Sequence, residues 1–240
     1  MTKVEAIKKV LEDNNGAASW NIIYNNIEKY YPTAKNSIEW KAGIRGVLYR
    51  EIRKDKSFKQ IGLGLFALKD YKTEKNPETQ DKIRMHSFIQ GICIELGNFK
   101  NFDTYTADPS ATFKDNISLL DMVSMQYLPD FTYKAIVDET KRIDVVWLNK
   151  KGLQFPHKVF EVVDSVGTLT GAFNRSLQLI NFQTDYYIIA PEKHRNKFLK
   201  TLSLEPYHTN SAKFTFVNYD SIIELYENTS RVKKIESGIF

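Results

Sequence analysis

The fold is decided by residues 141–165, KRIDVVWLNKKGLQFPHKVFEVVDS. This stretch contains two runs rich in β-branched and aromatic residues, which favour strands. Residues 149–152 separate the runs and are polar or glycine, as in a hairpin loop. If the turn is centred near Gly152, antiparallel pairing places Asp144 roughly opposite Glu161. The stretch therefore predicts a hairpin that carries two acids on one face of a sheet.

Two carboxylates among valines need a partner of opposite charge. Like charges at cross-strand positions repel each other, and burying them without a partner costs free energy. A divalent cation is the simplest partner, and Mg²⁺ (or Mn²⁺) prefers oxygen ligands such as Asp144 and Glu161. The alternative is that a basic side chain pairs with the acids, for which Arg142 and Arg175 are the candidates.

This hairpin resembles the core of the PD-(D/E)xK nuclease superfamily, through Asp144 in IDVVW and Glu161 in FEVV. The resemblance is closest to restriction-endonuclease-like proteins. It implies an α/β fold in which a mixed sheet is flanked by helices, and Mg²⁺-dependent hydrolysis of a DNA phosphodiester as in type II restriction enzymes. The chain departs from the superfamily at Val163, where relatives carry Lys or Glu. A catalytically silent nuclease fold that binds DNA as a regulator or specificity subunit is therefore the competing hypothesis.

The resemblance also implies roles for residues around the two metal ligands. Asp164 is the candidate that replaces the missing third residue, if it enters the site through a bulge. Glu95 is the acid on the helix before the sheet, and its alternative role is a solvent-facing helical residue. Arg175 and Gln178 lie three apart on the helix after the second acidic strand, where they share a face. We expect these two to contact the site or a DNA phosphate; the alternative is a plain surface role.

Residues 1–70 form a separate module in the pattern of the chain. Apolar periodicity predicts helices over residues 3–14, 20–30 and 36–53, and the GLGLF stretch predicts a hairpin after them. Three helices followed by a hairpin make a winged helix-turn-helix. The module resembles the HARE-type helix-turn-helix domain, which occurs fused to restriction-enzyme-like nucleases. The polar residues 71–81 then read as a linker to a nuclease-like domain over residues 82–240.

The positive charge of the chain is concentrated in this first module. Residues 1–70 hold 13 Lys and Arg against 8 Asp and Glu, whereas the remainder holds 21 of each sign. The net charge of +5 thus indicates that the module meets double-stranded DNA. By resemblance the third helix is the recognition helix, unless it only packs against the second domain. The expected DNA contacts are Ser37, Lys41, Arg45, Arg50, Arg53 and Lys54, with Lys56 and Lys59 near the wing.

Other classes of protein are disfavoured by composition. The single cysteine, Cys93, excludes an internal disulfide and a Cys-rich zinc site. No signal peptide is recognisable, and no apolar run approaches the roughly 20 residues that span a bilayer. A cytoplasmic protein is expected, with duplex DNA as partner. A homodimer would supply the two scissions that duplex cleavage requires. A winged helix that binds only protein is a third hypothesis, which the charge distribution argues against.

Overall fold

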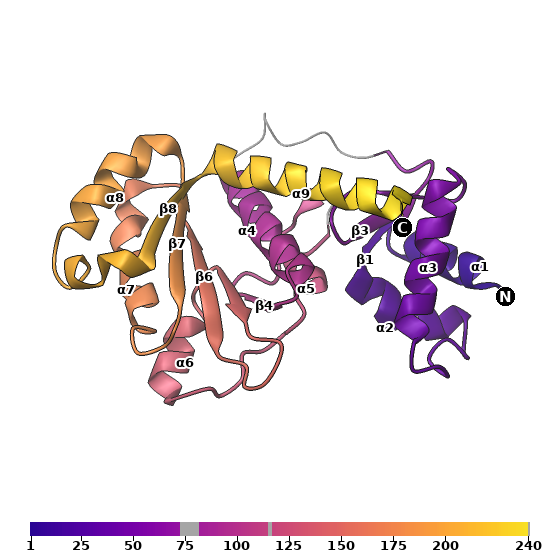
Figure 1. Cartoon of the computed structure of the whole chain (residues 1–240), viewed down its shortest axis with the longest axis horizontal. Helices are drawn as coiled ribbons and strands as arrows, with labels where there is room; N and C mark the ends of the chain where they lie inside the picture. The colour runs from indigo at the N-terminus through magenta and orange to yellow at the C-terminus, as the bar shows by residue number, and fades with distance from the viewer. Residues whose placement is uncertain (73–81, 115–116, 240) are drawn as a thin grey trace. The chain divides into compact units, whose positions relative to one another are not determined.

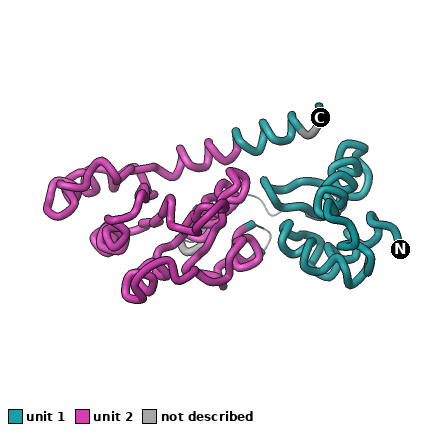
Figure 2. Tube along the Cα trace, turned by 60° about the horizontal axis from the view of Figure 1, so that its bottom comes forward, with its two compact units in different colours: residues 1–76, 114–117, 228–240 teal, residues 77–113, 118–227 magenta. Residues whose placement is uncertain are grey.

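The computed structural model describes residues 1–72, 82–114 and 117–239, and it divides into two compact units (Figure 2). Unit 1 comprises residues 1–76, 114–117 and 228–240, and unit 2 comprises residues 77–113 and 118–227. Most of the expected linker, residues 73–81, lies outside the described residues.

Residues 1–72 of unit 1 form three helices and a small antiparallel sheet whose strand order is β1-β3-β2. These elements are α1 (Lys3–Asp13), β1 (Ala17–Ser19), α2 (Trp20–Tyr30), α3 (Trp40–Arg53), β2 (Phe58–Gln60) and β3 (Leu65–Leu68). The three helices and the terminal hairpin were predicted; the strand β1 was not. Gly16 precedes β1 at φ +91°, a conformation that favours glycine.

Side-chain caps explain where two helices of unit 1 begin. Thr2 and Glu5 form a reciprocal capping box at α1, and the Ser19 hydroxyl accepts from the Ile22 backbone N–H at α2. The third helix begins at Trp40 rather than at residue 36. The Ser37 hydroxyl accepts from the Glu39 backbone N–H, a local bond that competes with helix formation.

Unit 2 is built on a five-stranded mixed sheet in the order β4-β5-β6-β7-β8. The first three strands are antiparallel and the last three are parallel, so β6 belongs to both parts. This is the mixed sheet that the sequence predicted. The strands are β4 (Asp103–Thr106), β5 (Val145–Leu148), β6 (Pro156–Val162), β7 (Asp185–Ala190) and β8 (Phe214–Asn218).

Helices flank this sheet, with α4 on one face and α7 and α8 on the other (Figure 1). On the α4 face the Trp147 indole donates to the Cys93 carbonyl at 3.0 Å. Gly97 permits this close approach, because a Cβ there would lie 2.5 Å from the Trp147 ring nitrogen. The α-helices are α4 (Lys82–Phe99), α5 (Leu119–Met122), α6 (Lys134–Thr140), α7 (Leu169–Leu177), α8 (Arg195–Leu202) and α9 (Tyr219–Ile239), and the 3-10 helices are η2 (Val166–Thr168), η3 (Glu192–His194) and η4 (His208–Lys213).

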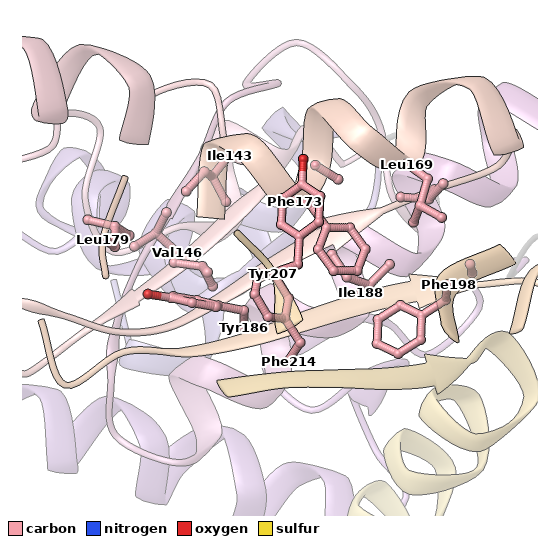
Figure 3. Close-up of a cluster of buried hydrophobic side chains, with 14 of the residues drawn as sticks. Ile143, Val146, Leu169, Phe173, Leu179, Tyr186, Ile188, Phe198, Tyr207 and Phe214 are labelled. Carbon is pink, nitrogen blue, oxygen red and sulfur yellow. The ribbon is translucent and has the colours of Figure 1, made fainter. Parts of the chain in front are cut away.

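The main core of unit 2 fills the space between the sheet and helices α7 and α8 (Figure 3). Phe173 stacks on Phe214 with ring centroids 4.5 Å apart, and Tyr207 meets Phe173 edge-on. Val159 and Val163 from β6 and its extension join this core. Because residues two apart share a face of a strand, Glu161 between them points to the same side.

Hydrogen bonds set several boundaries in unit 2. Helix α4 continues to Phe99, and the first strand begins at Asp103. Short helices α5 and α6 were not predicted. The helix after the hairpin ends at Leu177, and i to i−3 bonded turns follow it as far as Phe182. The last helix is capped by the Asn218 side chain, which accepts from the Ser221 N–H at 2.7 Å. No helix within the described ranges is long and apolar enough to cross a membrane.

Candidate active site

Asp144 and Glu161 meet at the end of the β5–β6 strand pair. The antiparallel register pairs Val145 with Phe160, and continued by one residue it brings Asp144 opposite Glu161. The register thus agrees with the expected cross-strand position of the two acids, and the side chain of Asp144 contacts α4 whereas that of Glu161 contacts α7. Asp144 precedes the first residue of β5, so its side chain projects from the strand end rather than from the middle of the sheet.

The Asp144 carboxylate is held by the backbone of β6 and by helix α4. Its Oδ2 accepts from the Val162 N–H at 2.7 Å. Its Oδ1 accepts from the Gln90 amide at 3.2 Å and lies 3.6 Å from Nε2 of His86. The side chain keeps 17% of its surface exposed. Both oxygens thus have protein partners, while one side of the group remains open to solvent.

The Glu161 carboxylate is buried, with a side chain 1% exposed, and it pairs with Arg175 of α7. The guanidinium donates from Nε to Oε1 at 2.7 Å and from NH2 to Oε2 at 2.5 Å. Burial raises the pKa of Glu161 to about 8, because it outweighs the opposing effect of Arg175, and the negative charge of Asp144 adds to the rise. The basic partner considered from the sequence is thus present and is Arg175.

His86 of α4 lies between Asp144 and Asp164. Its Nδ1 lies 3.0 Å from Oδ2 of Asp164, and the Tyr219 hydroxyl donates to the other oxygen of Asp164. Burial lowers the pKa of His86, but its hydrogen bonds with Asp144 and Asp164 outweigh burial and raise it to about 10. The histidine is therefore an imidazolium that bridges two carboxylates near neutral pH.

Position 163, where the PD-(D/E)xK resemblance leads to the expectation of Lys or Glu, is part of the hydrophobic core. Val163 is 1% exposed and belongs to the same apolar cluster as Leu169 and Phe173 of the chain segment around α7. Its backbone N–H donates to the Ile189 carbonyl at 2.8 Å, which continues the pairing of β6 with β7. Asp164, the expected replacement, is linked to Asp144 through His86.

Two further predicted site residues contact other partners. Glu95 lies five residues beyond Gln90 on α4, a rotation of about 140° around the helix axis. It is buried and accepts from the Tyr226 hydroxyl at 2.5 Å, so the solvent-facing alternative is wrong. Gln178 is exposed at the end of α7, and its amide donates to the Asn174 carbonyl at 3.3 Å.

The predicted DNA contacts of unit 1 are mostly exposed on and after α3. Lys41 lies 5.3 Å from the ring centre of Tyr24, and Arg45 donates to the Tyr24 hydroxyl at 3.3 Å. Lys59 is half-buried and donates to the Tyr71 carbonyl, which turns it toward its own unit. The exposed members of the set are Ser37, Lys41, Arg45, Arg50, Arg53, Lys54 and Lys56.

The donor atoms at the carboxylate pair suit a divalent cation in their chemistry. Asp144 and Glu161 supply two carboxylates, and the buried Oε1 of Gln90 beside Asp144 has no hydrogen-bond partner in the structure. An unpartnered acceptor on an amide that contacts Asp144 fits an oxygen-ligated cation such as Mg²⁺ or Mn²⁺. Within the described residues, no three His, Cys, Asp or Glu side chains are grouped so as to hold a metal by themselves.

Sequence inspection missed three residues of this site: His86, Gln90 and Tyr219. His86 and Gln90 are four residues apart and therefore share a face of α4, but that spacing is common in helices. Tyr219 begins α9, far along the chain from the other members. The sequence contains no signal that joins these three segments, since only the packing of the helices on the sheet brings them together.

Comparison with known proteins places this chain in a family. No curated protein and no protein of known structure shows significant similarity to the chain. A family model described as "Type II restriction enzyme NmeDI C-terminal domain" matches residues 67–239. The matched range includes the whole five-stranded sheet and every residue around Asp144 and Glu161. Because the match covers most of the chain, this protein belongs to the family of the Type II restriction enzyme NmeDI C-terminal domain.

Proposed function

We propose that this protein is a DNA endonuclease of the type II restriction class that hydrolyses phosphodiesters with Mg²⁺ or Mn²⁺ as cofactor. One observation carries the proposal: in a chain of a restriction-enzyme family, two carboxylates on neighbouring strands meet at the open end of the sheet. Burying charged groups costs free energy, and such buried groups are concentrated at functional sites.

Asp144 and Glu161 would hold the metal ion, as expected from the PD-(D/E)xK resemblance. The bound ion would polarise the phosphate and lower the pKa of an attacking water. The protein itself orients the acids: the Val162 N–H holds Asp144, and Arg175 holds Glu161 through both oxygens. His86 places a cationic group beside Asp144, with its Nε2 3.6 Å from Oδ1.

Unit 1 would deliver the duplex to this site. Its exposed Lys and Arg side chains on α3 suit contacts with phosphates, which position a protein on DNA without specifying sequence. We include specific or modified duplex DNA among the substrates and a homodimer as the active assembly, because cutting both strands requires two scissions.

The direct test is incubation of the purified protein with duplex DNAs, unmodified and cytosine-modified, in Mg²⁺, in Mn²⁺ and in EDTA. We expect metal-dependent cleavage by the natural protein and its loss in Asp144→Asn, which preserves side-chain shape. Asp138→Asn is the matched control, because Asp138 is exposed and pairs with Lys141. Cleavage that persists at the natural rate in Asp144→Asn would overturn the assignment of the active site.

The alternative is a silent nuclease fold that binds DNA. Two observations favour it: Val163 is packed in the core, and Arg175 engages both oxygens of Glu161. In that case the natural protein binds duplex DNA but does not cut it, whichever divalent metal is added. Asp144→Asn then binds DNA as well as the natural protein or better. Val163→Lys is unsuitable for restoring activity, because it would place an ammonium group in the apolar cluster.

A further inference from the structure

In the side chain of Gln90 the amide nitrogen has a hydrogen-bond partner and the amide oxygen has none. The residue is fully buried on α4, at 0% exposure. Its Nε2 donates to Oδ1 of Asp144 at 3.2 Å, but its buried Oε1 accepts from no group in the structure. Buried side-chain oxygens almost always have a partner, and leaving one without a partner costs free energy.

The surroundings of this oxygen restrict what could satisfy it. Asp144 is a carboxylate and offers only acceptors, and His86 directs its two ring nitrogens to Asp144 and Asp164. A cation attracted by the Asp144 carboxylate would also satisfy the Gln90 oxygen. Amide carbonyls and carboxylates are the oxygen ligands that suit Mg²⁺, Mn²⁺ and Ca²⁺.

We propose that Gln90 is a metal ligand, supplying a neutral oxygen to a cation held by the Asp144 carboxylate. The inference rests on the proposed metal-dependent function and adds the residue that replaces the acid missing at position 163. It explains why Val163 can be apolar: this oxygen comes from the helix on the opposite face of the sheet and not from β6. In the metal-free state the Gln90 N–H donates to Asp144. In the metal-bound state the Gln90 carbonyl oxygen would bind the ion that Asp144 holds.

A merely structural role makes a different prediction. If Gln90 only orients Asp144 through its N–H, then every substitution that removes the donor should disturb the site equally. If Gln90 is a ligand, the oxygen matters more than the donor. Gln90→Glu keeps an oxygen at the same reach and loses the neutral amide, whereas Gln90→Met keeps the shape and loses both groups.

The test is Mn²⁺ binding to the full chain without DNA. Binding is measured by titration calorimetry and by the electron paramagnetic resonance signal of free Mn²⁺. We expect the natural protein to bind one Mn²⁺ at this site, Gln90→Met to bind about tenfold more weakly, and Gln90→Glu to bind at least as tightly as the natural protein. Gln154→Met is the matched control, because the Gln154 amide also donates to a carboxylate, Asp103, at 2.9 Å. It should bind Mn²⁺ normally.

The outcomes separate this inference from the proposed function. Natural affinity in Gln90→Met, with cleavage retained, removes Gln90 from the ligand set and leaves the nuclease assignment standing. Equal weakening in Gln90→Met and Gln90→Glu assigns the residue to orienting Asp144 and overturns the ligand role. Absence of Mn²⁺ binding and of cleavage in the natural protein overturns both proposals. Circular dichroism and thermal unfolding of each variant identify any loss of binding that follows from misfolding.

Discussion

The two units handle their charged side chains in opposite ways. In unit 2 the acids at the sheet end are buried or half-buried, and each is held at a defined distance by a named partner. In unit 1 the cations of α3 are exposed, and Lys41 and Arg45 rest against Tyr24 rather than against acids. Charge is thus enclosed in one unit and presented to solvent in the other.

This difference teaches which charges the fold depends on. Removing one partner of a buried ion pair leaves an uncompensated charge and is strongly destabilising, whereas exposed charges contribute little to stability. Charged residues of unit 2 should therefore affect folding and function together. The charged residues of α3 should affect DNA binding but not folding.

The largest effect is expected from Arg175→Ala. Glu161 would remain buried without its bidentate partner, and the free energy of unfolding in urea should fall by about 3 kcal/mol at pH 9, above the Glu161 pKa of about 8, where the natural protein holds the carboxylate ionised. Arg142→Ala is the matched control, because Arg142 is exposed and pairs with Glu139 along one helix end. Its effect should stay within about 0.5 kcal/mol.

A second substitution separates the pair from the arginine itself. Combining Arg175→Ala with Glu161→Gln removes the buried charge, so the double variant should be more stable than Arg175→Ala alone. A double variant that is less stable than the single one would mean that Arg175 supports the fold by packing rather than by pairing with Glu161.

The next largest effect is the pH dependence due to His86. Its pKa is raised from 6.5 to about 10, so its contribution to stability is fully present below pH 6.5 and is lost as the pH rises toward 10. The pKa of Glu161, raised to about 8, also lowers stability with rising pH, but only between about 4.5 and 8. The window from pH 8 to pH 10 therefore separates the contribution of His86 from that of Glu161.

In that window the natural protein should lose about 2 kcal/mol more unfolding free energy than His86→Asn, measured by urea titration at both pH values. The comparison with the variant cancels the lysine and tyrosine groups that also titrate there. Equal pH slopes in the two proteins would show that the imidazole is not held as a cation between Asp144 and Asp164.

A smaller effect, on binding and not on folding, is expected from Lys41→Ala combined with Arg45→Ala. Loss of two phosphate contacts should weaken duplex binding about tenfold and reduce the slope of log K against log salt by about 2. Stability should change by less than about 0.5 kcal/mol, because both side chains are exposed. Fluorescence anisotropy over a salt series measures both quantities.

The control for net charge is Lys9→Ala combined with Lys29→Ala. These lysines are also in unit 1 but pair with Glu12 and Asp13. If the control pair weakens binding as much as Lys41 and Arg45 do, the basic charge acts without a defined surface. If neither pair matters, the hypothesis that unit 1 binds only protein gains support.

The smallest effect is expected at Gln178. Its amide is exposed and bonds only the Asn174 carbonyl of the same helix among its recorded contacts, so Gln178→Ala should leave stability and any cleavage rate within about twofold of the natural values. A strong loss of cleavage would restore its expected role at the site or on DNA and extend the functional surface along α7.

Much of the fold could be predicted from local sequence patterns. The central hairpin follows from its alternating apolar residues and its Gly152 turn, the latter at φ +77°. The start of α2 follows from the Ser19 cap, and the position of Asp144 opposite Glu161 follows from strand register. These features could be predicted because periodicity, caps and turns act between residues close in the chain.

The partners of the acids could not be predicted in the same way. Gln90 and Asp144 are 54 residues apart, and His86 and Asp164 are 78 apart. No local pattern marks such pairs, and Glu95, chosen as the acid of α4 by resemblance, faces Tyr226 instead.

The sequence by itself thus determined which strands form and that two acids share the end of a hairpin. The tertiary structure alone decided that Arg175 neutralises Glu161, that His86 joins Asp144 to Asp164, and that Val163 belongs to the core. The physical reason is that a buried charge takes the nearest partner that packing provides. Packing places α4 and α7 on opposite faces of the sheet, so each acid meets a different helix.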